Sequence, residues 1–126
     1  MREILFRAKR KATNDWVYGY FEKAYDDSQI YVSPKIITKY GSEYVREDTL
    51  GQYTGLTDKN GVKIFEGDII EYESKRYSIN YLSHYARFAA VKPNTVFCVF
   101  AYQRGEVIGN IYDNPELIGE DGEQDE

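Results

Sequence analysis

Two pairs of acidic residues lie close enough together to suggest acid–base chemistry. Glu66 and Asp68 are two positions apart, and Asp113 precedes Glu116 by three. Two carboxyl groups with different pKa values can serve as general acid and general base, as in a hydrolase. Each pair also lies in a predicted turn, where acidic side chains accept backbone hydrogen bonds. We therefore expect structural roles for these acids and no catalytic residues, with a hydrolase as an alternative.

Residues that commonly bind metals or act as nucleophiles are scarce. His84 is the single histidine and Cys98 the single cysteine, so an intramolecular disulfide is excluded and no zinc-site spacing is present. A calcium loop beginning at Asp58 would require glutamate at its twelfth position, which is Ile69. We expect Cys98 to be a buried apolar residue. We also expect no metal and no cofactor.

Charge is distributed unevenly along the chain. Of 21 acidic residues, five lie in the last eight positions, which leaves 16 acids against 16 basic residues in the rest of the chain. Residues 119–126 are therefore predicted to be an acidic tail that folding does not need. Basic residues instead gather at the N-terminus, as an exposed strand end and turn or as an arm that contacts phosphates.

Aromatic residues are more numerous than a small core can enclose. The chain has 13 tyrosines, six phenylalanines and one tryptophan, and each ring requires about 150–250 Å² of cover. Tyrosine is enriched in interfaces because its ring packs while its hydroxyl group still binds water or a partner. Seven tyrosines crowd the first half of the chain, and we expect several of them, together with at least one open sheet edge, to reach the surface. They are Tyr18, Tyr20, Tyr25, Tyr31, Tyr40, Tyr44 and Tyr53. The candidate partner contacts are Tyr31, Tyr40 and Tyr44, with the basic residues Arg2, Arg7, Lys9, Arg10 and Lys11.

These residues lie mainly in segments with the period-two pattern of β-strands. Trp16, Tyr18 and Tyr20 are predicted to share one strand face. Ser33–Pro34 is expected to separate two short strands, because proline cannot donate to a central ladder. Residues 95–102 are predicted to form a central strand that is covered on both faces.

Tight turns punctuate the second half of the chain. Asp58 can accept a hydrogen bond from the backbone two residues on, and Gly61 can adopt positive φ. Gly67 and Asp68 are predicted to form a bend before a strand. Asn114 is expected to cap a short helix that has proline at its first position. The residues assigned to structural turns are Asp58, Asn60, Gly61, Gly67, Asp68, Asn114 and Pro115.

Together these patterns predict a β-dominated α+β fold. Short N-terminal strands should lead into a small, bent, SH3-like barrel formed by the C-terminal part, because a strand that starts from a Gly-Asp corner is typical of such barrels. We expect a single domain over residues 1–118, with two small lobes of about 1–50 and 51–118 as an alternative. No segment has the length and apolarity of a membrane span, and the start does not have the pattern of a signal peptide, so we expect a cytoplasmic protein.

Three segments resemble the YopX family of phage and prophage proteins. They are the opening REILFRA, the central LGQYTGLTDKNGVKIFEGDII and the closing VIGNIYDNPELI. The resemblance implies a phage or prophage origin, an SH3-type barrel in the C-terminal part and self-association, with a trimer as one form. It implies no catalytic residues.

The expected function is that of a non-enzymatic accessory protein that acts through protein contacts as a homo-oligomer, in a bacterial host cell. An unidentified host or phage protein is a further expected partner. The alternative is a nucleic-acid-binding module that uses the basic N-terminal segment and exposed aromatic rings. A neutral body and an acidic tail oppose this alternative, since both weaken attraction to a polyanion.

Overall fold

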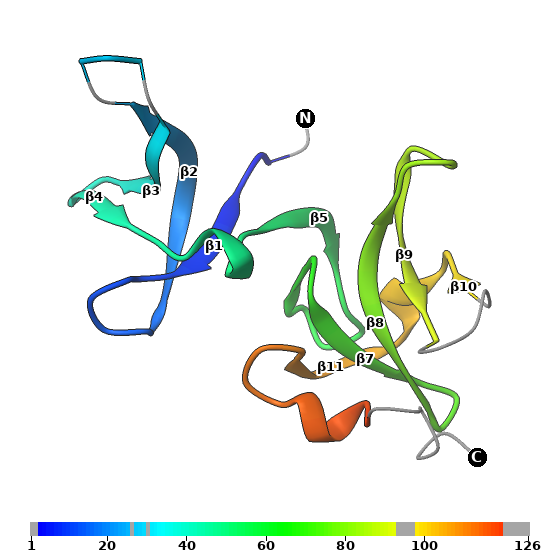
Figure 1. Ribbon diagram of the computed structural model, residues 1–126. Helices are drawn as coiled ribbons and strands as arrows, with labels where there is room; N and C mark the ends of the chain where they lie inside the picture. Colours follow the sequence, from blue (N-terminus) through cyan, green and yellow to red (C-terminus); the bar gives the residue numbers. More distant parts are fainter. Residues whose placement is uncertain (1–2, 26, 30, 93–97, 120–126) are drawn as a thin grey trace. The chain divides into compact units, whose positions relative to one another are not determined.

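The computed structural model describes residues 3–25, 27–29, 31–92 and 98–119 (Figure 1). The chain divides into two compact units, Met1–Tyr53 and Thr54–Glu126. Among the described residues, antiparallel strands dominate and the helices are single 3₁₀ turns. No described helix has the length and apolarity needed to cross a membrane. The prediction of a β-dominated fold is confirmed.

The N-terminal unit is built on an antiparallel sheet in which the first four strands of the chain are neighbours in chain order. Strand β5 is hydrogen-bonded to β1, continues into the C-terminal unit and is followed in the sheet order by β6. The elements of this unit are β1 (Phe6–Lys9), β2 (Trp16–Tyr25), β3 (Tyr31–Thr38), β4 (Gly41–Tyr44), the 3₁₀ turn η1 (Glu47–Thr49) and the start of β5 (Gly51–Thr57).

This sheet curls so that the end of β4 meets the end of β1. Arg10 and Val45 form an antiparallel bridge. The N–H of Lys11 donates to the carbonyl of Tyr44 at 3.0 Å, and the N–H of Arg46 donates to that of Lys9 at 2.8 Å. The curl encloses a small core of Ala8, Val17, Ile36 and Val45, with Phe6, Phe21 and Leu50 packed against it.

The predicted break at Ser33–Pro34 is wrong, because β3 runs through both residues. Pro34 lies opposite Lys23 of β2, and its carbonyl accepts the N–H of Val45 at 3.1 Å. The N and C=O of one residue in a strand point to the same side, so the missing donor faces Val45 and not β2. The ladder between β2 and β3 therefore loses no hydrogen bond at this proline.

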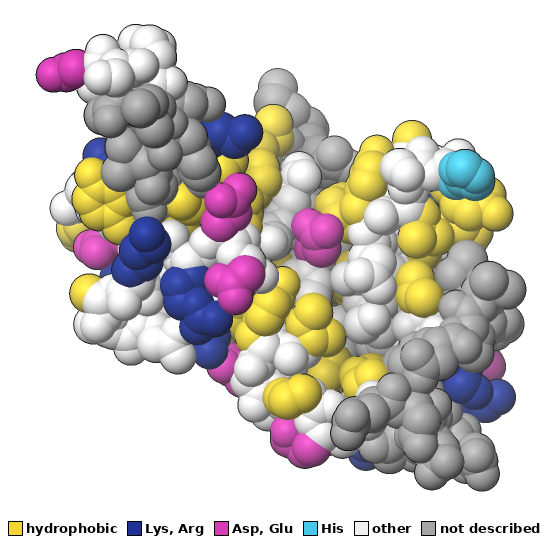
Figure 2. All heavy atoms as spheres, viewed as in Figure 1, with side chains coloured by type: hydrophobic (Ala, Val, Ile, Leu, Met, Phe, Trp, Pro, Cys, Tyr) yellow, Lys and Arg dark blue, Asp and Glu magenta, His cyan; other side chains and the backbone are white. Residues whose placement is uncertain are grey.

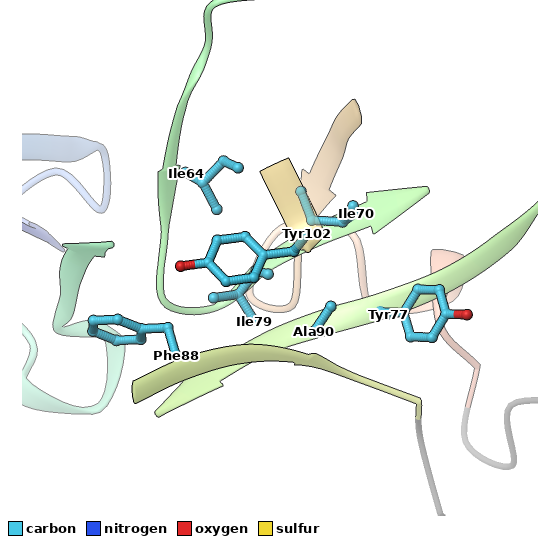
Figure 3. Close-up of a cluster of buried hydrophobic side chains, with 7 residues drawn as sticks. All are labelled: Ile64, Ile70, Tyr77, Ile79, Phe88, Ala90 and Tyr102. Carbon is cyan, nitrogen blue, oxygen red and sulfur yellow. The ribbon is translucent and has the colours of Figure 1, made fainter. Parts of the chain in front are cut away.

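The C-terminal unit contains a second antiparallel sheet, in the order β10-β9-β8-β7-β11. Its core consists of Ile64, Ile70, Tyr77, Ile79, Phe88, Ala90 and Tyr102, and Figure 3 shows the ring of Tyr102 lying among the isoleucines. The elements are β6 (Lys63–Phe65), β7 (Asp68–Tyr72), β8 (Lys75–Leu82), β9 (Arg87–Val91), β10 (Cys98–Val99), β11 (Glu106–Asn110) and the 3₁₀ turns η2 (Tyr102–Arg104) and η3 (Pro115–Leu117).

Two predictions for this unit are corrected. The SH3-like barrel is not confirmed, because the C-terminal sheet of the described residues runs from β10 to β11 and these two end strands do not pair. The predicted central strand over 95–102 begins outside the described residues, and its remainder forms the two-residue terminal strand β10 followed by η2. A continuous apolar run does not distinguish a strand from a bent segment whose side chains, such as that of Tyr102, enter the core.

Gly61 closes the turn between β5 and β6. Its φ is 85°, in the left-handed region, and its N–H donates to the carbonyl of Asp58 at 3.0 Å. A Cβ added at Gly61 would have no atom within 4 Å, so only backbone strain opposes a side chain there. We predict that Gly61→Ala lowers the free energy of unfolding by about 1 kcal/mol. An unchanged midpoint in thermal unfolding would contradict this assignment.

The hairpin between β7 and β8 offers a stabilising change. Tyr72 pairs with Lys75, and the two residues between them, Glu73 and Ser74, have φ of 51° and 67°. Positive φ at both central positions defines a type I′ turn, which favours Asn-Gly. We predict that the double change Glu73→Asn and Ser74→Gly raises the free energy of unfolding by about 1 kcal/mol. Reversing the order, with glycine at 73 and asparagine at 74, is the control, and an equal gain from both orders would contradict the turn type.

Candidate partner-contact surface

The register of the N-terminal sheet places several tyrosines on one face. Tyr18 and Tyr20 are two residues apart in β2, so their side chains point the same way. Two positions further along β2, Glu22 pairs with Lys35, which in turn pairs with Tyr44 of β4. Directly paired residues share a face in an antiparallel sheet, so Tyr44 lies on the face of Tyr18 and Tyr20.

These rings are exposed. The relative exposure is 47% for Tyr18, 66% for Tyr20 and 49% for Tyr44, and Tyr40, which follows β3, reaches 88%. Figure 2 shows hydrophobic side chains gathered on the surface over β3 and β4 of this unit. We call Tyr18, Tyr20, Tyr40 and Tyr44 the tyrosine face. Tyr18, Tyr20 and Tyr40 line one groove, so three of these four rings lie near one another.

An open groove of about 690 Å³ adjoins the tyrosine face. Tyr18, Tyr20 and Tyr40 are among its lining residues, together with Trp16 and Ile37. A groove of this size, lined mainly by apolar and aromatic residues, is suited to a side chain or a short segment of a partner.

Ion pairs occupy one part of the groove lining. The guanidinium of Arg10 lies 2.9 Å from the carboxylate of Asp15 and 3.5 Å from that of Glu43. The hydroxyl of Thr13 also donates to Asp15. Hydrogen bonds from Thr13 and then from Arg10 lower the pKa of Asp15 below its ordinary value. Arg10 is therefore engaged with two acids of its own chain.

Cations lie over several aromatic rings of the sheet. The guanidinium carbon of Arg7 is 4.5 Å from the centre of the Trp16 ring, and the ammonium of Lys9 is 5.4 Å from it. Lys35 lies 4.9 Å from the ring of Tyr44, and Lys39 lies 5.1 Å from that of Tyr40. Such cation–π pairs contribute about 0.5–1 kcal/mol of attraction each at exposed sites.

The predicted contacts only partly reach this surface. Arg7 and Lys9 are 6% and 7% exposed, so they cannot form a solvent-facing basic patch. Lys11 is exposed, while Arg2 and the side chain of Tyr31 lie outside the described residues. Tyr40 and Tyr44 belong to the tyrosine face. Tyr53, expected among the surface candidates, is 7% exposed and therefore buried.

Tyr18 and Tyr20 were missing from the candidate contacts, although a signal for them exists in the sequence. Their period-two spacing with Trp16 predicts a shared face, and the opposite residues Val17 and Phe21 are the more buried set. In β2 the side of the strand that carries Val17 and Phe21 packs inside, and the side that carries Tyr18 and Tyr20 is exposed.

Two of the predicted turn residues, Asp58 and Asn114, hydrogen-bond strand β11 in the C-terminal unit. The buried carboxylate of Asp58 accepts the N–H groups of Asn60 at 2.8 Å, Val62 at 2.9 Å and Val107 at 2.9 Å. Burial raises the pKa of Asp58, but the hydrogen bonds from Val107, Val62 and Asn60, together with the charge of Lys59, outweigh this effect. Its pKa therefore lies below the ordinary value.

Asn114 has a different role from the predicted one. It precedes η3, with Pro115 at the first helical position, but its side chain makes no capping hydrogen bond. Its Oδ1 instead accepts the N–H of Asn110 at 3.2 Å. The amide side chain thus binds strand β11 and not the helix start.

Two of the acids considered for catalysis, Asp68 and Asp113, have local hydrogen-bond partners. Asp68 is 2% exposed and its carboxylate accepts the N–H of Phe65 at 2.7 Å, across the bend at Gly67. Asp113 accepts the side-chain amide of Asn110 at 3.2 Å. Within the described part of the chain, no three His, Cys, Asp or Glu side chains are grouped as metal ligands.

Comparison with known proteins identifies a family and a similar solved structure. A family model described as YopX protein matches residues 5–119. The crystal structure of protein EF1440 from Enterococcus faecalis is similar, with 28% sequence identity, a TM-score of 0.59 and coverage of 94% of this chain and 100% of that chain. No curated protein matches.

Proposed function

Because the chain belongs to the YopX protein family, we propose that it is a non-enzymatic accessory protein of a phage or prophage that acts through protein contacts. In this proposal the protein works in the cytoplasm of a bacterial host. Its first partner is a second copy of itself, and the resulting homo-oligomer can then bind a host or phage protein.

The tyrosine face is the observation that carries this proposal. Exposure of 47% to 88% leaves large ring surfaces in water, and association would cover them. The tyrosine hydroxyl groups can bind water in the free protein and a partner in the complex, so the face is compatible with both states. The neighbouring groove offers a concave site for a partner side chain.

The positions of the acidic residues support a non-enzymatic role. Asp58 and Asp68 are buried and accept backbone N–H groups, which fixes turns instead of presenting carboxylates to a substrate. A general acid or base needs access to the group with which it exchanges a proton.

We predict that the double change Tyr20→Ser and Tyr40→Ser weakens self-association by at least about tenfold, since each lost ring removes about 1 kcal/mol or more of interface energy. Size exclusion with light scattering over a concentration series measures the effect. The matched control is Tyr81→Ser with Tyr85→Ser, because these tyrosines of the C-terminal unit are 49% and 61% exposed. This control should associate like the wild type.

A wild-type mass near 14.7 kDa at every concentration would contradict the homo-oligomer. An oligomer that both double variants preserve would support self-association but exclude the tyrosine face as its site.

Single-stranded nucleic acid is a second candidate partner, favoured by the cations over Tyr40 and Tyr44. Bases stack on exposed rings while nearby lysines contact phosphates. Fluorescence anisotropy of a labelled oligothymidylate at low salt tests this candidate. Truncation after Ile118, which removes five acids, should strengthen binding. Absence of binding by the truncated chain would rule out this partner.

A further inference from the structure

Asn60 and Gly61 are consecutive in the exposed turn between β5 and β6, and together they can undergo a reaction of their own. The backbone nitrogen of Gly61 is placed by the covalent chain so that it can attack the side-chain carbonyl carbon of Asn60. Glycine favours this attack because it has no Cβ to obstruct the approach. A Cβ added at Gly61 would meet no atom within 4 Å, so the described structure leaves this side of the turn open.

The side chain of Asn60 is exposed, and within the described part of the chain its amide group makes no hydrogen bond. A side chain that is held by hydrogen bonds must lose them before it can turn toward the next backbone nitrogen. Asn114 is excluded for a further reason, because the nitrogen of Pro115 carries no proton. The other asparagines that the structure describes are held through their side chains: Asn14 by Arg46, Asn80 by Ser78, Asn110 by Tyr112 and Asn114 by Asn110.

The turn itself restrains the reaction. The N–H of Gly61 donates to the carbonyl of Asp58 at 3.0 Å, so the attacking nitrogen must first leave this hydrogen bond. The carboxylate of Asp58 accepts the N–H groups of Asn60 at 2.8 Å and Val62 at 2.9 Å, one on each side of Gly61. The reaction therefore requires a local opening of the turn, and Asp58 opposes that opening.

We propose that Asn60 is a site of spontaneous deamidation and that the carboxylate of Asp58 slows the reaction. The nitrogen of Gly61 bonds to Cγ of Asn60, the bond between Cγ and Nδ2 breaks, and ammonia leaves with the proton from Gly61. Water then opens the resulting succinimide at either carbonyl, which gives aspartate or isoaspartate at position 60. The tyrosine face takes no part in this reaction, so the proposal goes beyond the proposed function.

The modification should weaken the turn that binds β11. Both products place a new negative charge in the turn that already holds the carboxylate of Asp58. Isoaspartate also lengthens the backbone between position 60 and Gly61, so the two N–H groups on either side of Gly61 should no longer both reach Asp58. The same carboxylate accepts the N–H of Val107, and the modification therefore affects a contact between the turn and β11.

The test is peptide mass spectrometry of the folded wild-type protein during incubation at mildly alkaline pH. A gain of about 1 Da, from replacing an amide by a carboxyl group, should appear at Asn60. It should appear at least about fivefold faster there than at the other described asparagines, since each of these must first break a hydrogen bond. The matched control is Asn60→Gln, which retains an exposed amide but must close a larger ring, so its peptide should stay unmodified.

Asp58→Asn tests the restraint, with circular dichroism showing that the chain is folded. Loosening the turn should speed the conversion of Asn60 by at least about fivefold, and fragmentation spectra separate this conversion from any at position 58. An unchanged rate would overturn the role of Asp58. The site itself would be overturned if folded wild type showed no gain at Asn60 while the urea-unfolded chain converted there, or if the Asn60→Gln peptide gained the same mass.

Discussion

Replacing Asp58 by alanine is expected to lower the free energy of unfolding of the C-terminal unit by about 3–4 kcal/mol. The change leaves the N–H groups of Asn60, Val62 and Val107 without their acceptor, and a hydrogen bond to a charged group contributes about 1.5–3 kcal/mol. Asp58 is 5% exposed, so water cannot easily replace the carboxylate. Hydrogen exchange of the backbone amides of Ile70 and Ile79 reports the stability of this unit.

Asp58→Asn is the control, because it keeps the shape of the side chain and removes its charge. The amide retains one oxygen acceptor but directs an NH₂ group toward backbone donors, so it should recover only part of the loss. A loss below about 1 kcal/mol for Asp58→Ala would contradict the account, because three well-formed hydrogen bonds to a carboxylate are worth more.

Asp58 also gives a pH dependence with a defined sign. Because its pKa in the folded protein is lowered, the folded state favours the ionised form more than the unfolded chain does. This contribution to stability is fully present above the unfolded pKa of about 3.9, and it is lost as pH falls through the lower folded value. The stability difference between the wild type and Asp58→Asn should therefore be constant near neutral pH and shrink in acid below about pH 4.

Gly19→Ala is expected to destabilise the N-terminal unit by about 3 kcal/mol. A Cβ at Gly19 would lie 2.2 Å from the carbonyl oxygen of Ile37, and this oxygen belongs to the backbone of β3. Neither strand can move without disturbing the ladder between β2 and β3, so the overlap is costly. The fluorescence of Trp16, the single tryptophan, follows unfolding of this unit in urea.

Gly41→Ala separates steric overlap from backbone strain. Gly41 has φ of 129°, and an added Cβ would have no atom within 4 Å. Its substitution should cost about 1 kcal/mol, through strain alone. Equal effects at both glycines would contradict the claim that the close approach of Ile37 makes glycine necessary at position 19.

Local chemistry made the turns of the second half predictable. Asp58, Asn60 and Gly61 lie within four positions, and the turn requires an acceptor at the first position and positive φ at the last. The bond from Val107 to Asp58 could not be predicted in this way, since 49 residues separate the two. Asn114 differs, because its side chain accepts the N–H of Asn110, only four residues earlier, and makes no capping hydrogen bond.

Burial was harder to predict than strand position in the N-terminal unit. Alternation along β2 predicted which residues share a face, and the number of aromatic rings predicted that several tyrosines reach the surface, but neither pattern identified which ones do. The charge of Arg7 and Lys9 suggested exposed contact residues, but both side chains lie beside Trp16 and are nearly buried. Long cationic side chains cover apolar surface along their stems, and a charge count does not record this behaviour.

Hydroxyl-radical footprinting of the tyrosines, at concentrations below and above self-association, tests the tyrosine face most directly. The account predicts that Tyr18, Tyr20, Tyr40 and Tyr44 become protected from oxidation as concentration rises. Tyr81 and Tyr85 serve as internal controls of similar exposure and should remain equally reactive. Unchanged reactivity of the tyrosine face in an associated sample, or protection confined to Tyr81 and Tyr85, would contradict the central claim.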